Sequence, residues 1–255
     1  MNKLFKYVFL DIIRSKIILF YSLSLLAISL SIFNISDSPV KAIISLMNIQ
    51  LIVLPLICGI FSTIYFYNSS EFIELLVAQP IKRRTIFFGI LLSLIFALSL
   101  AFIIGIGIPL FVYSPDLTSL LFLFTGIGLT IVFTSFALAA SVYANDKARG
   151  IGVTLLIWFY FTLIYDGLIL FLLFRFSEYP LEKAVIAISF LNPVDLVRIL
   201  ILLKVDMAAI MGYTGAIFKD FFGTINGILL SSLALLLWFF IPARMSLKKF
   251  LKKDL

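Results

Sequence analysis

Residues 71–85, EFIELLVAQPIKRRT, interrupt the first half of a chain that is otherwise almost entirely apolar there. Glu71 and Glu74 are three residues apart and would therefore share one face of a helix. Pro80 would end that helix, because proline removes a backbone donor and disfavours helical geometry in the residue before it. The stretch thus predicts a short amphipathic helix over residues 71–79. Its apolar face would carry Phe72, Leu75 and Leu76.

Three consecutive cations, Lys82, Arg83 and Arg84, follow the proline. Cations concentrate at the cytoplasmic ends of membrane spans, and two long apolar runs flank the stretch, one ending near Phe66 and one beginning at Ile86. A helix held between two spans at the cytoplasmic surface is suited to binding a soluble partner. A solvated loop that merely follows the charge rule accounts for the same residues equally well, and the residues alone leave both interpretations open.

The whole chain is far more apolar than a soluble protein. It has 255 residues, of which 63% are hydrophobic and 13% charged, whereas soluble domains are roughly half apolar and a quarter charged. The apolar surface must therefore face lipid. Because a span takes about 20 residues, the length predicts an all-α polytopic membrane protein with about six transmembrane helices. The predicted spans cover residues 17–33, 42–67, 86–113, 120–144, 151–174 and 225–242.

The cations predict the orientation of these spans. Fourteen of the 20 Lys and Arg residues lie in residues 1–16, in residues 71–85, in the turn after the fourth span and in the tail after the sixth. The positive-inside rule then places both termini in the cytoplasm, with the chain in the inner (cytoplasmic) membrane. Residues 1–16 combine an apolar stripe with cations, which predicts an interfacial amphipathic helix before a transmembrane domain of residues 17–255. The segment 175–222 would face outward.

The outward segment 175–222 contains one clear helix signal. Asn192 is suited to cap a helix that begins at Pro193, and Asp195 in the first turn suits the helix dipole. The segment mixes charges with amphipathic stretches and is too polar to cross the membrane. We therefore interpret it as an extracytoplasmic helical segment that docks a partner.

Asp166 is an ionisable residue within the fifth predicted span. A carboxylate at membrane depth is costly unless it finds a partner or water. The outward cations nearest in sequence are Arg175 and Arg198. A structural role is favoured over substrate binding, and we expect Asp166 to tie the fifth span to the helix at Asn192 through Arg198.

Little in the sequence points to enzymatic chemistry. The chain has no histidine, one cysteine and no G-x-x-x-x-G-K-[ST] motif, so it lacks the commonest general base and a P-loop for ATP. The distribution of cations does not favour nucleic acid as a partner. Met207 and Met211 are four residues apart, a pairing that can bind Cu(I), but packing in an apolar core explains them more simply. We expect no catalytic residue, no metal site and no cofactor.

The stretch of residues 71–85 resembles the first cytoplasmic loop of ABC-2-type transporter permeases. The resemblance lies in its Glu-Leu-Leu, Gln-Pro and basic sequence and in its place after the second span. In that family the loop forms the coupling helix that docks on the ATP-binding subunit, where ATP is hydrolysed. The resemblance implies this coupling role for Glu71, Phe72, Glu74, Leu75, Leu76, Gln79 and Pro80.

Within that family, the NPVDLVR sequence of residues 192–198 is similar to the NPxDLxR stretch of the NosY-type permease, and so is the Tyr165-Asp166 pair. That permease is the membrane subunit of the transporter for nitrous oxide reductase maturation. The resemblance implies a homodimer with two ATPase subunits, a periplasmic β-helical partner and a copper chaperone. The assembly would serve the copper centres by transport or by mechanical transmission. An exporter of lipids, glycans or drug-like molecules, and a membrane scaffold without transport, stay open as alternatives.

Overall fold

The computed structural model of the protein describes residues 2–176, 182–204 and 225–252, and within these ranges every regular element is a helix. Two of the elements, labelled η, are π-helical. The elements are α1 (Asn2–Ile13), α2 (Lys16–Ile35), α3 (Pro39–Asn68), α4 (Ser70–Val77), α5 (Arg83–Phe102), η1 (Ile103–Gly107), α6 (Ile108–Tyr113), α7 (Leu117–Tyr143), α8 (Lys147–Phe159), η2 (Tyr160–Ile164), α9 (Tyr165–Arg175), α10 (Glu182–Ser189), α11 (Pro193–Lys204) and α13 (Ile225–Lys252).

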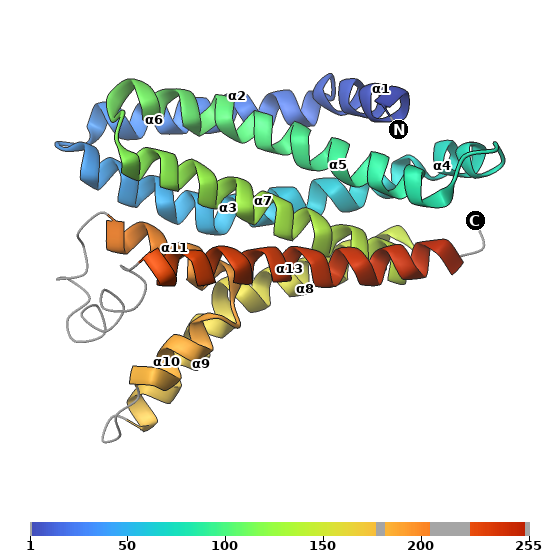
Figure 1. Cartoon of the computed structure of the whole chain (residues 1–255). Coiled ribbons are helices and arrows are strands. Elements are labelled where there is room, and N and C mark those ends of the chain that lie inside the picture. Colours follow the sequence, from blue (N-terminus) through green and yellow to red (C-terminus); the bar gives the residue numbers. More distant parts are fainter. Residues whose placement is uncertain (1, 177–181, 205–224, 253–255) are drawn as a thin grey trace.

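In the described residues, six helical segments are long and apolar enough to cross a membrane. The long helices form one bundle, and both ends of the chain lie at the end of the bundle that also carries α4 (Figure 1). The predicted all-α polytopic membrane protein is therefore confirmed. The six segments are Lys16–Ile35, Pro39–Asn68, Arg83–Tyr113, Leu117–Tyr143, Lys147–Leu172 and Gly227–Lys252.

The last helix is longer than the sequence predicts. The predicted span ends at Pro242, but α13 continues through this proline to Lys252. The continuation buries Phe250 completely, beside the rings of Phe66 in α3 and Phe87 in α5. Burying a phenylalanine side chain contributes about 2 kcal/mol, which offsets much of the cost of about 3 kcal/mol for a proline inside a helix.

The third span remains helical through Gly105, Gly107 and Pro109. Pro109 has no N–H to donate to the carbonyl of Gly105, and the π-helix η1 lies at this point. The hydroxyl of Ser29 in α2 donates to that carbonyl, with 2.7 Å between the oxygens. A hydroxyl from a neighbouring helix thus satisfies the freed backbone group, as membrane helices require.

Helices α3 and α7 run parallel, joined by polar contacts along their interface. Gln50 Nε2 donates to Thr125 Oγ1 at 3.3 Å, and nearer the α4 end Tyr67 donates to the carbonyl of Ser141 at 3.0 Å. Helix α7 also receives a side chain of α5, because a Cβ atom on Gly126 would lie 2.3 Å from the Phe102 ring. The absence of a side chain at Gly126 makes room for this ring.

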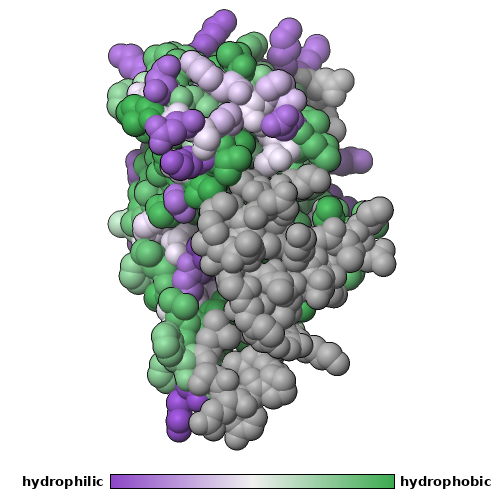
Figure 2. Space-filling model, turned by 90° about the vertical axis from the view of Figure 1, so that its left-hand side faces the viewer, coloured by the Kyte–Doolittle hydropathy of each residue, from purple (hydrophilic) through white to green (hydrophobic). Residues whose placement is uncertain are grey.

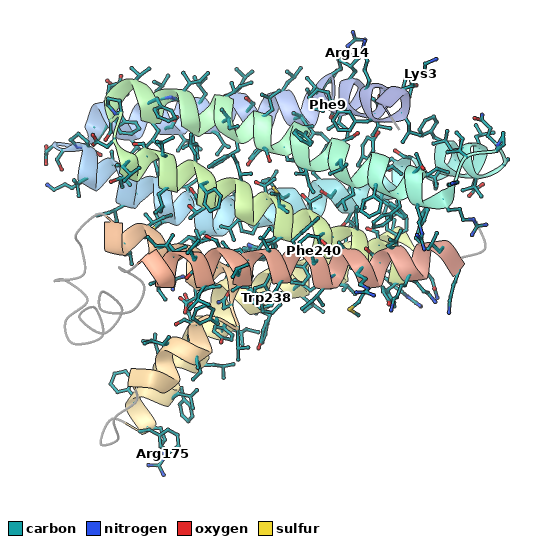
Figure 3. The ribbon with its side chains drawn as sticks, in the orientation of Figure 1. Lys3, Phe9, Arg14, Arg175, Trp238 and Phe240 are labelled. Carbon is teal, nitrogen blue, oxygen red and sulfur yellow. The ribbon has the colours of Figure 1, made fainter. Side chains whose placement is uncertain are left out.

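Helix α1 packs along α5. Its buried side chains include Val8 and Ile12, and Ser93 of α5 donates to the carbonyl of Phe5 at 3.1 Å. Lys3 and Arg14 point away from the bundle, whereas Phe9 points toward it (Figure 3). The predicted amphipathic pattern is present, and the position of the helix at the membrane interface stays a prediction.

Helix α11 lies inside the bundle rather than on its outer surface. It packs against α3, α7 and α13, and Leu196, Val197 and Ile201 are fully buried. The sequence predicts this helix as part of the outward segment 175–222, and this packing is not among the predictions. The reason is that PVDLVRILILLK carries apolar residues around most of its circumference, so the helix can bury several faces at once. Helices α9 and α10 instead project away from the bundle (Figure 1).

Candidate functional sites at α4 and at the base of α9

Helix α4 packs its apolar side on α5 and α3. Ile73 and Leu76 are buried, and Phe72 and Val77 pack against the core from partly buried positions. The prediction that Leu75 belongs to the apolar face is wrong, because its side chain is 65% exposed. Leu75 lies four residues after Glu71, and this spacing places it on the same helix face as that carboxylate.

The end of α4 also differs from the prediction. The helix ends at Val77, and a turn over residues 78–80 follows it. Gln79 and Pro80 are exposed in this turn. The residue before a proline disfavours helical geometry, and here the helix ends two residues earlier still. The predicted helix over residues 71–79 is therefore present in a shorter form that begins at Ser70.

The exposed face of α4 carries two carboxylates and one apolar side chain. Glu71, Glu74 and Leu75 are all exposed, and their spacing of three and four residues places them on one helix face. The Leu75 side chain is not buried against any described part of the chain. The face therefore suits a protein partner with an apolar pocket and nearby cations, the combination of central apolar contact and charged rim that specific interfaces use.

The base of α4 connects to several spans. Phe72 contacts the ring of Tyr7 in α1, with 5.5 Å between centroids. At the adjacent end of α3, Asn68 accepts a hydrogen bond from Lys147 of α8 at 2.9 Å. After the turn, Arg83 Nη1 donates to the carbonyl of Leu251 in α13 at 3.3 Å. A displacement of α4 would therefore reach α1, α3 and α5 through direct contacts. It would reach α8 through the end of α3 and α13 through the start of α5.

A cluster of three charges lies at the base of α9. Arg198 Nη2 is 2.7 Å from Asp166 Oδ2, and the side chains are 30% and 27% exposed. Arg198 Nη1 is 3.3 Å from Asp195 Oδ1, whose side chain is 11% exposed. The predicted contact between Asp166 and Arg198 is present. Asp195 shares the same guanidinium, which was not predicted, although the i, i+3 spacing of Asp195 and Arg198 is a signal for it.

Asn192 fixes the start of α11 in two ways. Its Oδ1 accepts the backbone N–H of Val194 at 2.9 Å, so the predicted helix cap is present, with Pro193 at the first helical position. Its Nδ2 donates to the carbonyl of Phe161 in η2 at 2.9 Å. This second bond joins the start of α11 to the π-helix that precedes α9, and no sequence pattern indicated it.

Two further hydrogen bonds hold the connection between α10 and α11. Tyr165 of α9 donates to the carbonyl of Ile188 at 2.6 Å, and Trp238 of α13 donates through Nε1 to the carbonyl of Phe190 at 3.1 Å. The two bonds tie this connection to α9 and to α13.

Metal-binding chemistry has no support in the residues that the structure describes. No group of three or more His, Cys, Asp or Glu side chains in those ranges could hold a metal ion. Met207 and Met211 lie outside the described residues. The structure therefore does not test whether they contact Cu(I).

The comparisons with known proteins agree with the motif at residues 192–198. The chain is 30% identical over 148 residues to the probable ABC transporter permease protein NosY of Pseudomonas aeruginosa, covering 54% of each chain. It is 30% identical over 171 residues to the probable ABC transporter permease protein NosY of Stutzerimonas stutzeri, covering 62% of each. The chain is similar to NosY permeases. The match spans between about half and two thirds of the length of these NosY relatives, and no protein-family profile matches the chain.

Proposed function

We propose that the chain is the membrane subunit of an ABC transporter and that α4 couples it to a separate ATP-binding subunit. The observation that carries the proposal is the exposed face of Glu71, Glu74 and Leu75, on a helix at the end of the bundle where both termini lie. Similarity to proteins named ABC transporter permeases supports this assignment. The chain itself would hydrolyse no ATP.

The contacts around α4 support a mechanical route from that face into the spans. A force on α4 reaches α1 through Phe72 and Tyr7 and reaches α13 through Arg83 and the Leu251 carbonyl. These contacts join rigid helices, so α4 and the adjacent span ends would move together. The direction of that movement follows from the nucleotide state of the partner.

The more specific proposal is that the transporter serves the maturation of the nitrous oxide reductase copper centres, by transport or by mechanical transmission to a periplasmic partner. Its basis is the 192–198 motif and the similarity to NosY proteins. We propose a homodimer in the inner membrane with cytoplasmic termini, and a periplasmic β-helical protein and a copper chaperone as outer partners. An ABC-2 exporter and a scaffold without transport are the competing functions.

The test is ATP hydrolysis by the chain co-purified with its ATP-binding subunit. Changing Glu71→Lys and Glu74→Lys together should abolish the ATPase activity that depends on the membrane subunit, while insertion into the membrane is kept. Asp37→Lys is the matched control, because Asp37 is exposed at the opposite end and forms a surface ion pair with Lys41. Full coupled activity in the double variant would show that α4 is not the coupling element.

A further inference from the structure

Five buried polar atoms inside the bundle have no hydrogen-bond partner among the residues that the structure describes. A polar group without a partner is much more costly in a protein interior than at a surface, so each of these atoms calls for one. The five are Tyr21 Oη, Gln50 Oε1, Ser62 Oγ, Ser99 Oγ and Thr134 Oγ1.

Ser62 in α3 and Thr134 in α7 differ from neighbouring hydroxyl residues in the same helices. Thr63 and Thr130 each donate to the backbone carbonyl four residues earlier, at 3.0 Å. Ser62 and Thr134 are both 0% exposed, and within the described chain their hydroxyls form no such bond. Their hydroxyls are therefore available to a partner that lies between the helices.

Ser62 and Thr134 occupy facing positions on α3 and α7. The Cys58 thiol of α3 lies beside the Thr130 hydroxyl of α7, and Ser62 and Thr134 each follow by four residues, one helical turn. Because the two helices run parallel, the same step along both keeps the pair opposite. The two hydroxyls do not bond to each other. A gap of this kind between two polar groups is one that a bridging water can span.

Tyr21 adds a third helix to this place. Its side chain lies in α2, is 4% exposed and comes close to Cys58. Its hydroxyl is also without a partner in the part of the chain that the structure describes, although a buried tyrosine hydroxyl usually has one. Unpaired groups from α2, α3 and α7 thus lie around Cys58.

This polar centre is far from both ends of the bundle. Thr130 is the central residue of α7, which has 27 residues, so it lies about 20 Å from each end of that helix. Hydrophilic side chains are visible on the end of the bundle away from α4 (Figure 2), but groups at the centre cannot reach the water there. Only protein groups or water bound inside the bundle can pair with them.

We propose that the bundle binds water molecules at this centre, with one water bridging Ser62 to Thr134 and another on the Tyr21 hydroxyl beside Cys58. A buried water needs about two to four polar partners, and these four side chains provide them. An acyl chain or closer apolar packing in the same space would leave the hydroxyls unpaired. The site is separate from the Asp166–Arg198 pair and does not rest on the proposed coupling function.

Hydroxyl-radical labelling of the chain in nanodiscs tests the site. A short X-ray pulse makes radicals from water, including water bound inside a protein, and mass spectrometry measures the modification of each side chain relative to the unfolded chain. Tyr21 and Cys58 should be modified at least about tenfold faster than Phe250. Phe250 is the dry control, because it is fully buried beside the rings of Phe66 and Phe87. Modification of Tyr21 and Cys58 as slow as that of Phe250 would overturn the proposal.

A substitution that keeps the shape of the side chain gives an independent test. Thr134→Val should lower the unfolding midpoint by about 2 to 4 °C, because it leaves a bound water without one of its partners. Thr134→Val combined with Ser62→Ala should cost less than the two separate effects added together, since both act on one water. In a dry interior Thr134→Val would instead remove an unpaired hydroxyl, and an unchanged or raised midpoint would contradict the water bridge.

Discussion

Arg198 of α11 and Asp166 of α9 form an ion pair, with 2.7 Å between Nη2 and Oδ2. Because α11 packs inside the bundle and α9 leads out of it, this pair is a point at which the bundle holds α9. Asp195 uses the same guanidinium at 3.3 Å. One cation shared by two carboxylates thus contributes to the attachment of α9, beside the hydrogen bonds of Asn192 and Tyr165.

Removing the charge of Asp166 should weaken this attachment. Asp166→Asn keeps the shape and should lower the stability of the folded chain by about 1 to 2 kcal/mol, since the pair is partly exposed. The measurement is the thermal unfolding midpoint in nanodiscs. Asp37→Asn at the exposed Lys41 pair is the control and should change stability by less than about 0.5 kcal/mol.

The contact with Arg198 is tested by combining two changes. Asp166→Asn and Arg198→Gln together should cost less than the sum of the single changes, by about 0.5 to 3 kcal/mol, because they act on one pair. Arg198→Gln alone should be the more harmful single change, since it leaves two carboxylates without their cation. Fully additive costs would show that the two side chains do not interact.

The close contact of α7 with α5 should tolerate no added methyl group. Gly126→Ala places a Cβ atom 2.3 Å from the buried Phe102 ring, which should cost about 1 to 3 kcal/mol through overpacking. Gly152 in α8 is the matched control because a Cβ atom there meets nothing within 4 Å. Gly152→Ala should be neutral or stabilising by up to about 1 kcal/mol. Equal unfolding midpoints for the two variants would argue against this packing.

Leu75 should contribute to binding of the ATP-binding subunit. Leu75→Ser removes an exposed apolar group at the centre of the α4 face and should weaken binding about tenfold, the effect of a central interface residue. Leu117, at the start of α7, has nearly the same exposure, 63% against 65%, and Leu117→Ser should leave binding unchanged. The dissociation constant can be measured by titrating the labelled ATP-binding subunit against the chain in nanodiscs. Equal affinities for the two variants would remove Leu75 from the interface.

The features that the sequence predicts well are those set by local chemistry. Long apolar runs give the six spans, and the Asn-Pro pair at 192–193 gives the cap and start of α11. An unpaired charge inside a membrane is costly, and few outward cations lie near Asp166 in sequence, so Arg198 could be predicted as its partner. Each of these features follows from residues that are near one another in the sequence.

The features that the sequence does not predict depend on distant contacts. Whether α13 passes Pro242 depends on Phe250 reaching Phe66 and Phe87. Leu75 is a different case, because its place four residues after Glu71 already puts it on the face of the carboxylates, and its assignment to the apolar face was wrong on spacing alone. The burial of α11 depends on three other helices. Residue spacing alone carries no information about these approaches.

Photo-cross-linking from position 75 tests the central claim most directly. A photoreactive amino acid replaces Leu75 in cells that also make the ATP-binding subunit, and the cross-linked protein is identified by mass spectrometry of the purified adduct. The same amino acid at Leu117 is the control at the opposite end of the bundle. We predict a cross-link from position 75, and none from position 117, to a protein that contains a G-x-x-x-x-G-K-[ST] sequence. An intact complex with that protein but no cross-link from position 75 would contradict the claim that α4 is the coupling helix.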